Sequence, residues 1–136
     1  MNQVNVSPSR YQTVMVVDDN EIDRYIAEGV IIKNRFAGKV IIAESAADAL
    51  SFIEAHADKP GELPQVIFLD INMPEMNGFE FLDRYEKLPE QVKKNCIIMM
   101  LTTSLDENDR RSASENKYVS MFLNKPLNKE KLETVK

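Results

Sequence analysis

Five short apolar runs, each followed by a segment of helical character, determine the architecture that this 136-residue chain can adopt. The runs are rich in Val and Ile and cover residues 14–17, 40–42, 66–69, 97–101 and 119–123. Uninterrupted apolar runs of this length are typical of strands that are covered on both faces. Strands that alternate with helices favour a parallel sheet with helices on both sides. The sequence therefore predicts a three-layer, doubly wound α/β fold with five parallel strands.

Apolar residues between these runs recur at helical spacing and predict helix faces that pack on the sheet. The predicted faces consist of Ile22, Tyr25, Ile26 and Val30; Ala46, Ala49, Leu50 and Ile53; Phe79, Leu82 and Tyr85; and Leu132 with Val135. Ser45 and Asp48 have the spacing of a helix N-cap pair. The helix predicted for residues 107–116, after the N-cap candidate Asp106, has only a thin apolar face. We therefore expect that helix to pack most loosely.

The composition indicates one globular domain and excludes two classes of protein. Hydrophobic residues make up 43% and charged residues 29% of the chain, which is ordinary for a globular protein of this length. The net charge of -5 argues against binding to nucleic acid through phosphate contacts. No apolar run approaches the roughly 20 residues that cross a bilayer. The polar start lacks the apolar core of a secretion signal, so we expect a cytoplasmic protein. We expect a flexible N-terminal tail over residues 1–11 and a domain over residues 12–136.

Polar side chains that suit metal and phosphoryl chemistry lie within two residues after the end of four of the five runs. They are Asp18 and Asp19, Asp70, Thr102 and Thr103, and Lys125 before Pro126. Because ligands of open α/β sheets bind at the carboxyl ends of the strands, we expect these groups to surround one crevice. Carboxylates suit a hard cation such as Mg²⁺, and an Asp beside that cation can attack a phosphoryl group. A Lys held at a strand end can place its charge on a phosphate.

Each of these residues also has a plainer interpretation. Asp18 and Asp19 precede a predicted helix, whose N-terminus favours carboxylates. Asp70 suits a turn after a strand, and Thr103 suits a β-branched strand position with a free hydroxyl. Lys125 alone could be a solvated surface charge of little consequence. The argument for a shared site comes from the order of these residues and from their common place at strand ends.

The chain resembles the receiver domain of two-component response regulators. The resemblance rests on four motifs at strand ends, in this order: an acidic pair, an Asp before an x-x-x-Pro loop, a Thr and a Lys-Pro pair. The resemblance covers residues from about 12 to the end of the chain. It implies a flavodoxin-like fold with the strand order 2-1-3-4-5. It also implies the following roles: Asp70 as the phosphoacceptor; Asp18, Asp19, Asp70 and the backbone carbonyl of Asn72 as ligands of Mg²⁺; Thr102 and Phe122 as the switch; Lys125 as the phosphoryl-binding ammonium; and Asn72 and Ser104 as residues that tune dephosphorylation.

The resemblance implies a phosphorylation-activated signalling switch, which catalyses only its own phosphorylation and dephosphorylation. The phosphoryl donor would be a sensor histidine kinase or a histidine phosphotransfer protein. The surface around the fourth helix and the fifth strand would then change for an unidentified protein target. Residues 116–120 depart from the family's common Gly-Ala before the last strand. No output domain follows, so we expect a stand-alone receiver or a piece of a longer chain.

Two other functions stay open at this point. One is a receiver-like module that binds a partner without being phosphorylated. The other is a Mg²⁺-dependent phosphatase with Asp70 as its nucleophile. Such phosphatases usually place a second acid two residues after the nucleophile, where this chain has Asn72, which cannot protonate a leaving group. The residues therefore favour the switch over the phosphatase and leave the binding module as the alternative.

Overall fold

A five-stranded, all-parallel sheet forms the centre of the computed structural model, which describes residues 8–135. The strand order is β2-β1-β3-β4-β5, which confirms the predicted doubly wound, flavodoxin-like fold. The strands are β1 (Tyr11–Val17), β2 (Ala37–Ala43), β3 (Val66–Leu69), β4 (Ile97–Thr102) and β5 (Val119–Asn124). The central strand β3 is buried along its whole length, which explains its uninterrupted apolar sequence.

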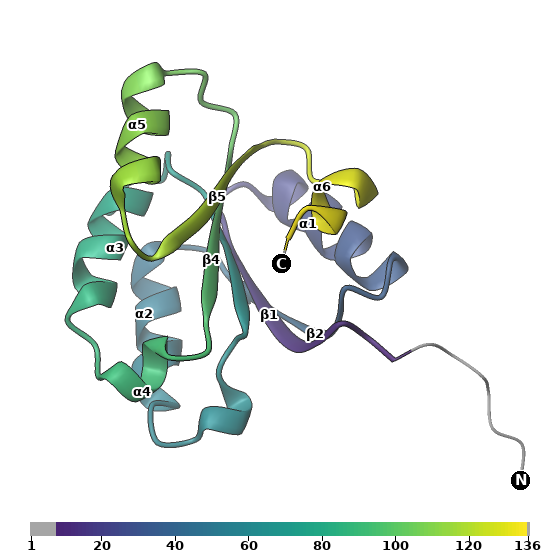
Figure 1. The fold of residues 1–136 in the computed structure, drawn as a ribbon, viewed down its shortest axis with the longest axis vertical. Coiled ribbons are helices and arrows are strands. Elements are labelled where there is room, and N and C mark those ends of the chain that lie inside the picture. The colour runs from purple at the N-terminus through teal and green to yellow at the C-terminus, as the bar shows by residue number, and fades with distance from the viewer. Residues whose placement is uncertain (1–7, 136) are drawn as a thin grey trace, which may run out of the picture.

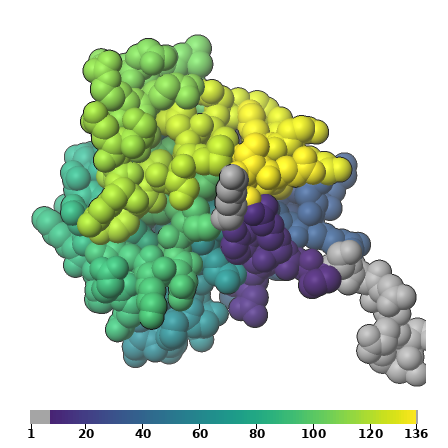
Figure 2. Space-filling view, viewed as in Figure 1, coloured from purple at the N-terminus to yellow at the C-terminus, as the bar shows by residue number. Residues whose placement is uncertain are grey.

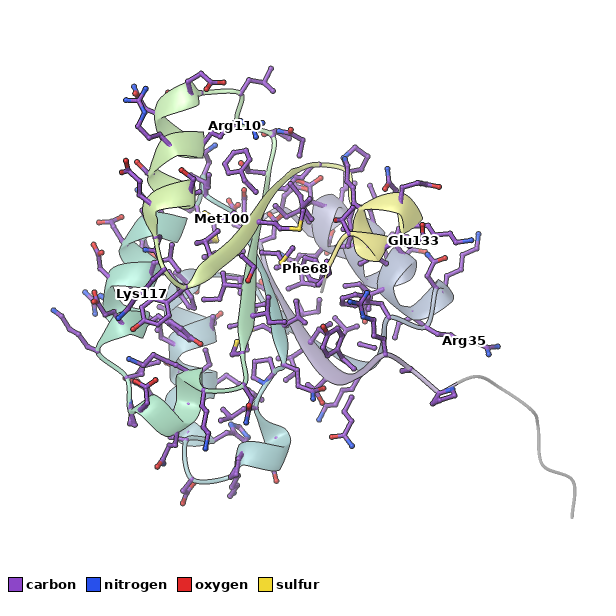
Figure 3. The ribbon with its side chains drawn as sticks, viewed as in Figure 1. Arg35, Phe68, Met100, Arg110, Lys117 and Glu133 are labelled. Atoms are coloured by element: carbon purple, nitrogen blue, oxygen red, sulfur yellow. The ribbon has the colours of Figure 1, made fainter. Side chains whose placement is uncertain are left out.

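Helices cover both faces of the sheet (Figure 1). The helical elements are α1 (Glu21–Lys33), α2 (Ala46–Ala55), a 3₁₀ turn (Pro60–Glu62), α3 (Gly78–Glu86), α4 (Glu90–Lys93), α5 (Glu107–Glu115) and α6 (Lys129–Glu133). Helices α2, α3 and α5 lie on one face, whereas α1 and α6 lie on the other. Each face has its own apolar core, and the labelled side chains of Met100 and Phe68 lie in the two different cores (Figure 3).

Polar caps fix where five of the helices begin. The residue before each of these helices accepts a hydrogen bond from a backbone N–H of the first turn. These caps are Asn20, Ser45, Asn77, Asp106 and Asn128. The predicted pairing of Ser45 with Asp48 is confirmed, since the Ser45 hydroxyl accepts from the Asp48 N–H at 3.0 Å. Every one of these helices follows the carboxyl end of a strand, so the caps lie along the same edge of the sheet.

The start of β1 packs against the end of the chain. The backbone N–H of Arg10 donates to the carbonyl of Arg35, and the guanidinium of Arg10 bonds the carbonyls of Leu132 and Val135. Figure 2 shows this packing as the contact between the purple N-terminal and the yellow C-terminal segments. Arg10 and Tyr11 therefore belong to the folded domain, although the sequence placed them in the tail. Residues 1–7 of the predicted tail lie outside the described residues.

No helix within residues 8–135 has the length and apolar character needed to cross a bilayer.

The predicted core face of α1 is wrong for Ile22, Tyr25 and Ile26, whereas the fourth predicted residue, Val30, is partly buried and packs against the core. Ile22 and Tyr25 are 67% and 77% exposed, and Ile26 is 39% exposed. The helix instead packs on the sheet through Ala27 and Ile31, which are also four residues apart. The sequence of α1 thus contains two overlapping apolar series of the same period, and periodicity alone could not select between them.

Polar contacts in the first turns of α1 set the rotation of the helix. The guanidinium of Arg24 donates to the backbone carbonyl of Asp18 at 2.9 Å. The carboxylate of Asp23 reaches the ammonium of Lys125 at 2.7 Å. These two contacts turn Arg24 and Asp23 toward the end of the sheet and leave the larger apolar side chains of the first turns in solvent.

Helix α5 buries little of its surface, in line with its thin apolar face. Ala113 is the one residue of α5 that is buried, and no other part of this helix reaches the core as deeply. Leu105, in the loop before α5, is 86% exposed. Helix α5 can therefore shift against the sheet with little loss of buried apolar area.

The close approach of α3 to the end of β3 requires glycine at position 78. A Cβ atom at Gly78 would lie 2.6 Å from the carbonyl oxygen of Asp70. We expect Gly78→Ala to lower the free energy of unfolding by about 1–3 kcal/mol, as overpacking does elsewhere. Gly29→Ala is the control, because nothing lies within 4 Å of its added Cβ. We expect that helix-interior change to stabilise the protein by about 1 kcal/mol. Urea unfolding of the two variants beside the unsubstituted protein tests both signs; a Gly78→Ala variant as stable as Gly29→Ala would contradict the steric argument.

Candidate functional site

Three carboxylates meet at the carboxyl edge of the sheet. One oxygen from each of Asp18, Asp19 and Asp70 lies within 4.8 Å of the others. Asp18 and Asp70 are only 4% and 5% exposed, whereas Asp19 is exposed to solvent. The predicted convergence of the tips of β1 and β3 therefore holds for these acids.

Backbone hydrogen bonds that continue the sheet beyond its strands hold these positions. The N–H of Asp18 donates to the carbonyl of Ala43 at 3.1 Å, and the N–H of Asp70 donates to the carbonyl of Val17 at 3.0 Å. On the other side of the site, the N–H of Lys125 donates to the carbonyl of Thr102 at 2.9 Å. The site residues are thus placed by the rigid sheet, although they follow the regular strands in sequence.

The ammonium of Lys125 binds three carboxylates. Its Nζ lies 2.6 Å from Asp18 Oδ2, 2.7 Å from Asp23 Oδ2 and 3.5 Å from Asp70 Oδ2. The Lys125 side chain is 9% exposed, so these contacts form largely away from water. The peptide bond between Lys125 and Pro126 is cis. Lys125 is therefore a buried cation shared between the tips of β1 and β3 and the first turn of α1.

Asp23 is the one member of this cluster that the sequence did not single out. It occupies the third position of α1, where its backbone N–H donates to the side chain of the cap Asn20. An acid in a first helical turn normally indicates only a favourable interaction with the helix dipole. The available signal was its place one turn after the acidic pair, on a helix that starts at the predicted site.

Burial and neighbouring charges shift two pKa values in this cluster. Burial raises the pKa of Asp70 to about 6; the Lys125 ammonium opposes that shift, and the Asp18 carboxylate adds to it. Burial works against the charge of Lys125, but hydrogen bonds to Asp18 and Asp23 outweigh it and raise the pKa of the ammonium above its ordinary value. At neutral pH the site therefore holds an ionised Asp70 beside a firmly protonated lysine.

Thr102 lies at the end of β4 and is fully buried, whereas the neighbouring Thr103 is exposed. The Thr102 hydroxyl oxygen accepts a hydrogen bond from the backbone N–H of Ser104 at 3.1 Å. The Ser104 hydroxyl in turn donates to Asp109 of α5 at 2.7 Å. Of the two threonines at the predicted edge, Thr102 is thus the one inside the molecule, and hydrogen bonds link it to α5.

Phe122 and Asn72 lie around this edge in different environments. The ring of Phe122 on β5 is partly buried, and the guanidinium carbon of Arg110 on α5 lies 4.8 Å from its centroid. This distance is within the range of a cation–π contact. Asn72 is exposed in the loop between β3 and α3, two residues after Asp70.

The donor set fits a divalent cation. Three carboxylates supply hard oxygen ligands within one ion's reach, and the exposed Asp19 leaves one side open to water. Lys125 partly neutralises two of these carboxylates, Asp18 and Asp70. A buried carboxylate beside a cation site and an ammonium can accept a phosphoryl group.

We expect the charge of Asp70 to cost stability at neutral pH in buffer that contains EDTA. The folded pKa of about 6 lies above the unfolded value of 3.8, so the native state binds the proton more tightly. Stability should therefore fall as the pH rises from about 4 to about 6 and then level off. Asp70→Asn cannot ionise, so it should be more stable than the unsubstituted protein at pH 7.5 by about 1–3 kcal/mol, with a smaller difference at pH 4.

Urea unfolding across this pH range measures the difference between the two proteins. Asp58→Asn provides the control, because Asp58 is an exposed acid in the loop between α2 and β3, which leads to the amino end of the sheet. We expect that variant to follow the unsubstituted protein at every pH. A difference between the Asp70→Asn variant and the unsubstituted protein that does not change with pH would show that the charge of Asp70 is not responsible.

Comparison with protein families and known proteins gives a consistent result. The family model of the response regulator receiver domain matches residues 14–135. The probable methanogenesis regulatory protein FilR2 of Methanothrix harundinacea is 26% identical over 120 residues, which are 88% of this chain and 76% of FilR2. The chain also matches two histidine kinases of Arabidopsis thaliana, of whose length it spans only 7%.

Solved structures of response regulators have the same fold. A two-component response regulator from Cytophaga hutchinsonii superposes with a TM-score of 0.83 at 26% identity, covering 90% of this chain and 91% of that one. The Mn²⁺-bound form of the response regulator Rcp1, a protein of Synechocystis sp., superposes with a TM-score of 0.69 at 25% identity. That match covers 89% of this chain and 86% of Rcp1.

Proposed function

This chain belongs to the response regulator receiver family, a family of signalling modules rather than enzymes, and we propose that it is a switch activated by phosphorylation of Asp70. The observation that carries the proposal is the environment of the Asp70 carboxylate. It is buried at the tip of β3, within a carboxylate cluster, with the Lys125 ammonium 3.5 Å away. The carboxylates beside Asp70, from Asp18 and Asp19, and the Lys125 ammonium match the chemistry that a phosphoryl acceptor requires.

The proposed reaction transfers a phosphoryl group from a protein phosphohistidine to Asp70. A receiver domain implies a kinase partner, and we propose a sensor histidine kinase or a histidine phosphotransfer protein in that role. An Asp70 carboxylate oxygen attacks phosphorus, the bond between phosphorus and the histidine nitrogen breaks, and an acyl phosphate forms. When bound by Asp18, Asp19, Asp70 and the backbone carbonyl of Asn72, Mg²⁺ would supply positive charge against these carboxylates and the incoming group. The Lys125 ammonium supplies the chain's own positive charge beside the same oxygens.

Phosphorylation would change the hydrogen bonds of Lys125 and Thr102. The new dianionic group attracts the Lys125 ammonium and the proton of the Thr102 hydroxyl, whose oxygen now accepts from the Ser104 N–H. Moving a two-state switch from 1:99 to 99:1 takes about 5.5 kcal/mol. Two or three charge-assisted hydrogen bonds of about 1.5–3 kcal/mol each can supply that free energy.

The proposed output surface consists of α5 and β5. Movement of Thr102 would displace Ser104, whose backbone N–H donates to the Thr102 hydroxyl. The displacement would reach Asp109 of α5 through the hydrogen bond that the Ser104 hydroxyl donates. It would also open space for the partly buried ring of Phe122. Because α5 buries only Ala113, its position can respond to such small forces. A downstream protein would read this change.

The exposed side chain of Asn72 and the partly buried side chain of Ser104 lie on the loops after β3 and β4. We propose that both tune the attack of water on the acyl phosphate, which resets the switch.

Two features weigh against the alternatives. A phosphatase with Asp70 as nucleophile would need an acid for its leaving group, and the residue two positions on is the amide Asn72. A binding module that works without phosphorylation would have no use for buried carboxylates, whose burial costs stability. The cluster of Asp18, Asp70 and Lys125 therefore favours the phosphorylated switch.

We expect incubation with acetyl phosphate and Mg²⁺ to add the mass of one phosphoryl group to the intact protein. The label should be absent from Asp70→Asn and from a sample with EDTA in excess, because the acceptor oxygen or the cation is then removed. Intact-mass spectrometry measures the label. Asp83→Asn, which changes an exposed acid on α3, is the control and should label normally. No label on the unsubstituted protein would favour the binding module, and sustained hydrolysis of phosphate esters would favour the phosphatase. A label that persists in Asp70→Asn would refute the choice of acceptor.

A further inference from the structure

We propose that Asp23 is a positioning residue that holds the Lys125 ammonium in the unmodified protein and must release it when Asp70 carries a phosphoryl group. This inference rests on the proposed function of Asp70 and adds a regulatory element to the same site. The distance from Lys125 Nζ to Asp23 is 2.7 Å, whereas the distance to Asp70 is 3.5 Å. The ammonium thus lies closer to Asp23, and to Asp18 at 2.6 Å, than to the carboxylate of Asp70.

The local structure of α1 leaves the Asp23 carboxylate free for this role. In a capping box, an acid at this position accepts from the backbone N–H of the cap residue. Here the N–H of the cap Asn20 donates to Asp18 Oδ1 at 2.9 Å instead. The Asp23 side chain thus has no capping duty and reaches across to Lys125, which lies 102 positions away in sequence. The contact joins α1 to the end of β5.

Asp23 differs from the other two partners of Lys125 in its exposure to water. Its side chain is 33% exposed, compared with 5% for Asp18 and 7% for Asp70. When its contact with Lys125 breaks, the Asp23 carboxylate can be hydrated, so release costs less than for a fully buried acid. The Asp18 carboxylate is far less accessible to water, so hydration would compensate it less. Asp23 is therefore the partner that Lys125 gives up most easily.

The consequence for the switch is a competition for one ammonium. In the unmodified protein, the Lys125 ammonium lies 3.5 Å from the Asp70 carboxylate. A phosphoryl group on Asp70 would place two negative charges on this side of the ammonium. In this proposal, the approach of Lys125 to these charges lengthens its contact with Asp23. That lost contact opposes the modified state, so Asp23 biases the equilibrium toward the unmodified one.

The first test compares the affinity of Asp23→Asn and the unsubstituted protein for beryllium fluoride in the presence of Mg²⁺, measured by calorimetry. Beryllium fluoride is the probe because it mimics a phosphoryl group on a carboxylate. The amide keeps the shape of Asp23 and removes its charge, so we expect binding to become about twofold to fivefold tighter, the size of a partly exposed ion pair. Glu21→Gln is the matched control, because Glu21 is an exposed acid in the same turn. We expect it to change the affinity by less than about twofold.

The second test reads Lys125 directly, without Mg²⁺ or a phosphoryl mimic. Nitrogen-detected NMR of the lysine side chains shows an ammonium whose protons exchange slowly because they are hydrogen-bonded. We expect a signal from Lys125, assigned by its loss in Lys125→Met, in the unsubstituted protein and in Glu21→Gln. In Asp23→Asn the signal should weaken through faster exchange.

These outcomes separate the inference from the proposed function. Equal tightening by Glu21→Gln and Asp23→Asn would mean a general charge effect and would overturn the role of Asp23, as would unchanged or weaker binding by Asp23→Asn. An unchanged Lys125 signal in Asp23→Asn would also overturn it. If the unsubstituted protein binds no beryllium fluoride and takes no label from acetyl phosphate, the proposed function fails and the release step fails with it. The Lys125 signal would then still decide whether Asp23 holds the ammonium.

Discussion

The site depends on one buried ammonium that balances a group of carboxylates. Asp18 and Asp70 are almost completely buried, and two such charges repel each other strongly where water is excluded. Lys125, 9% exposed, lies within 2.6–3.5 Å of oxygens from Asp18, Asp23 and Asp70. Removing one partner of a buried, paired charge leaves the others uncompensated, which is costly. The position of β5, the rotation of α1 and the ionisation of Asp70 are therefore linked through a single side chain.

The parallel sheet explains how residues from distant parts of the chain meet at this point. Parallel strands present all their carboxyl ends at one edge, and the ladder of hydrogen bonds continues past the strands to Asp18, Asp70 and Lys125. The helices that follow begin at the same edge with polar caps. One of these helices supplies Asp23, and another, α3, starts at Gly78 close against the carbonyl of Asp70. Helix α3 thus packs closely against the chain where Asp70 lies.

The sequence predicted the strands and the residues at their ends, because both depend on local features of the chain. Apolar runs of strand length and the polar residue after each run are visible without knowledge of tertiary structure. It could not predict the rotation of α1, since Ile22 and Ile26 have the same spacing as the buried Ala27 and Ile31. The sequence also could not predict the contacts of Asp23 and Arg110. Asp23 contacts Lys125, 102 positions away, and the contact of Arg110 with Phe122 depends on how α5 lies against β5. Such side-chain contacts are settled by packing between elements, which periodicity does not encode.

The two faces of the sheet differ in how their helices are held. On the α1 face, the start of β1 and the end of α6 are joined through Arg10, and α1 is held to the site by Asp23 and Arg24. On the other face, α5 contributes only Ala113 to the core and otherwise contacts the sheet through polar or cation–π interactions. Under the proposed function, a change in hydrogen bonding at the site would act on an element that loses little buried apolar area when it shifts. Helix α5 is such an element, and hydrogen bonds connect it to Thr102 through Ser104 and Asp109.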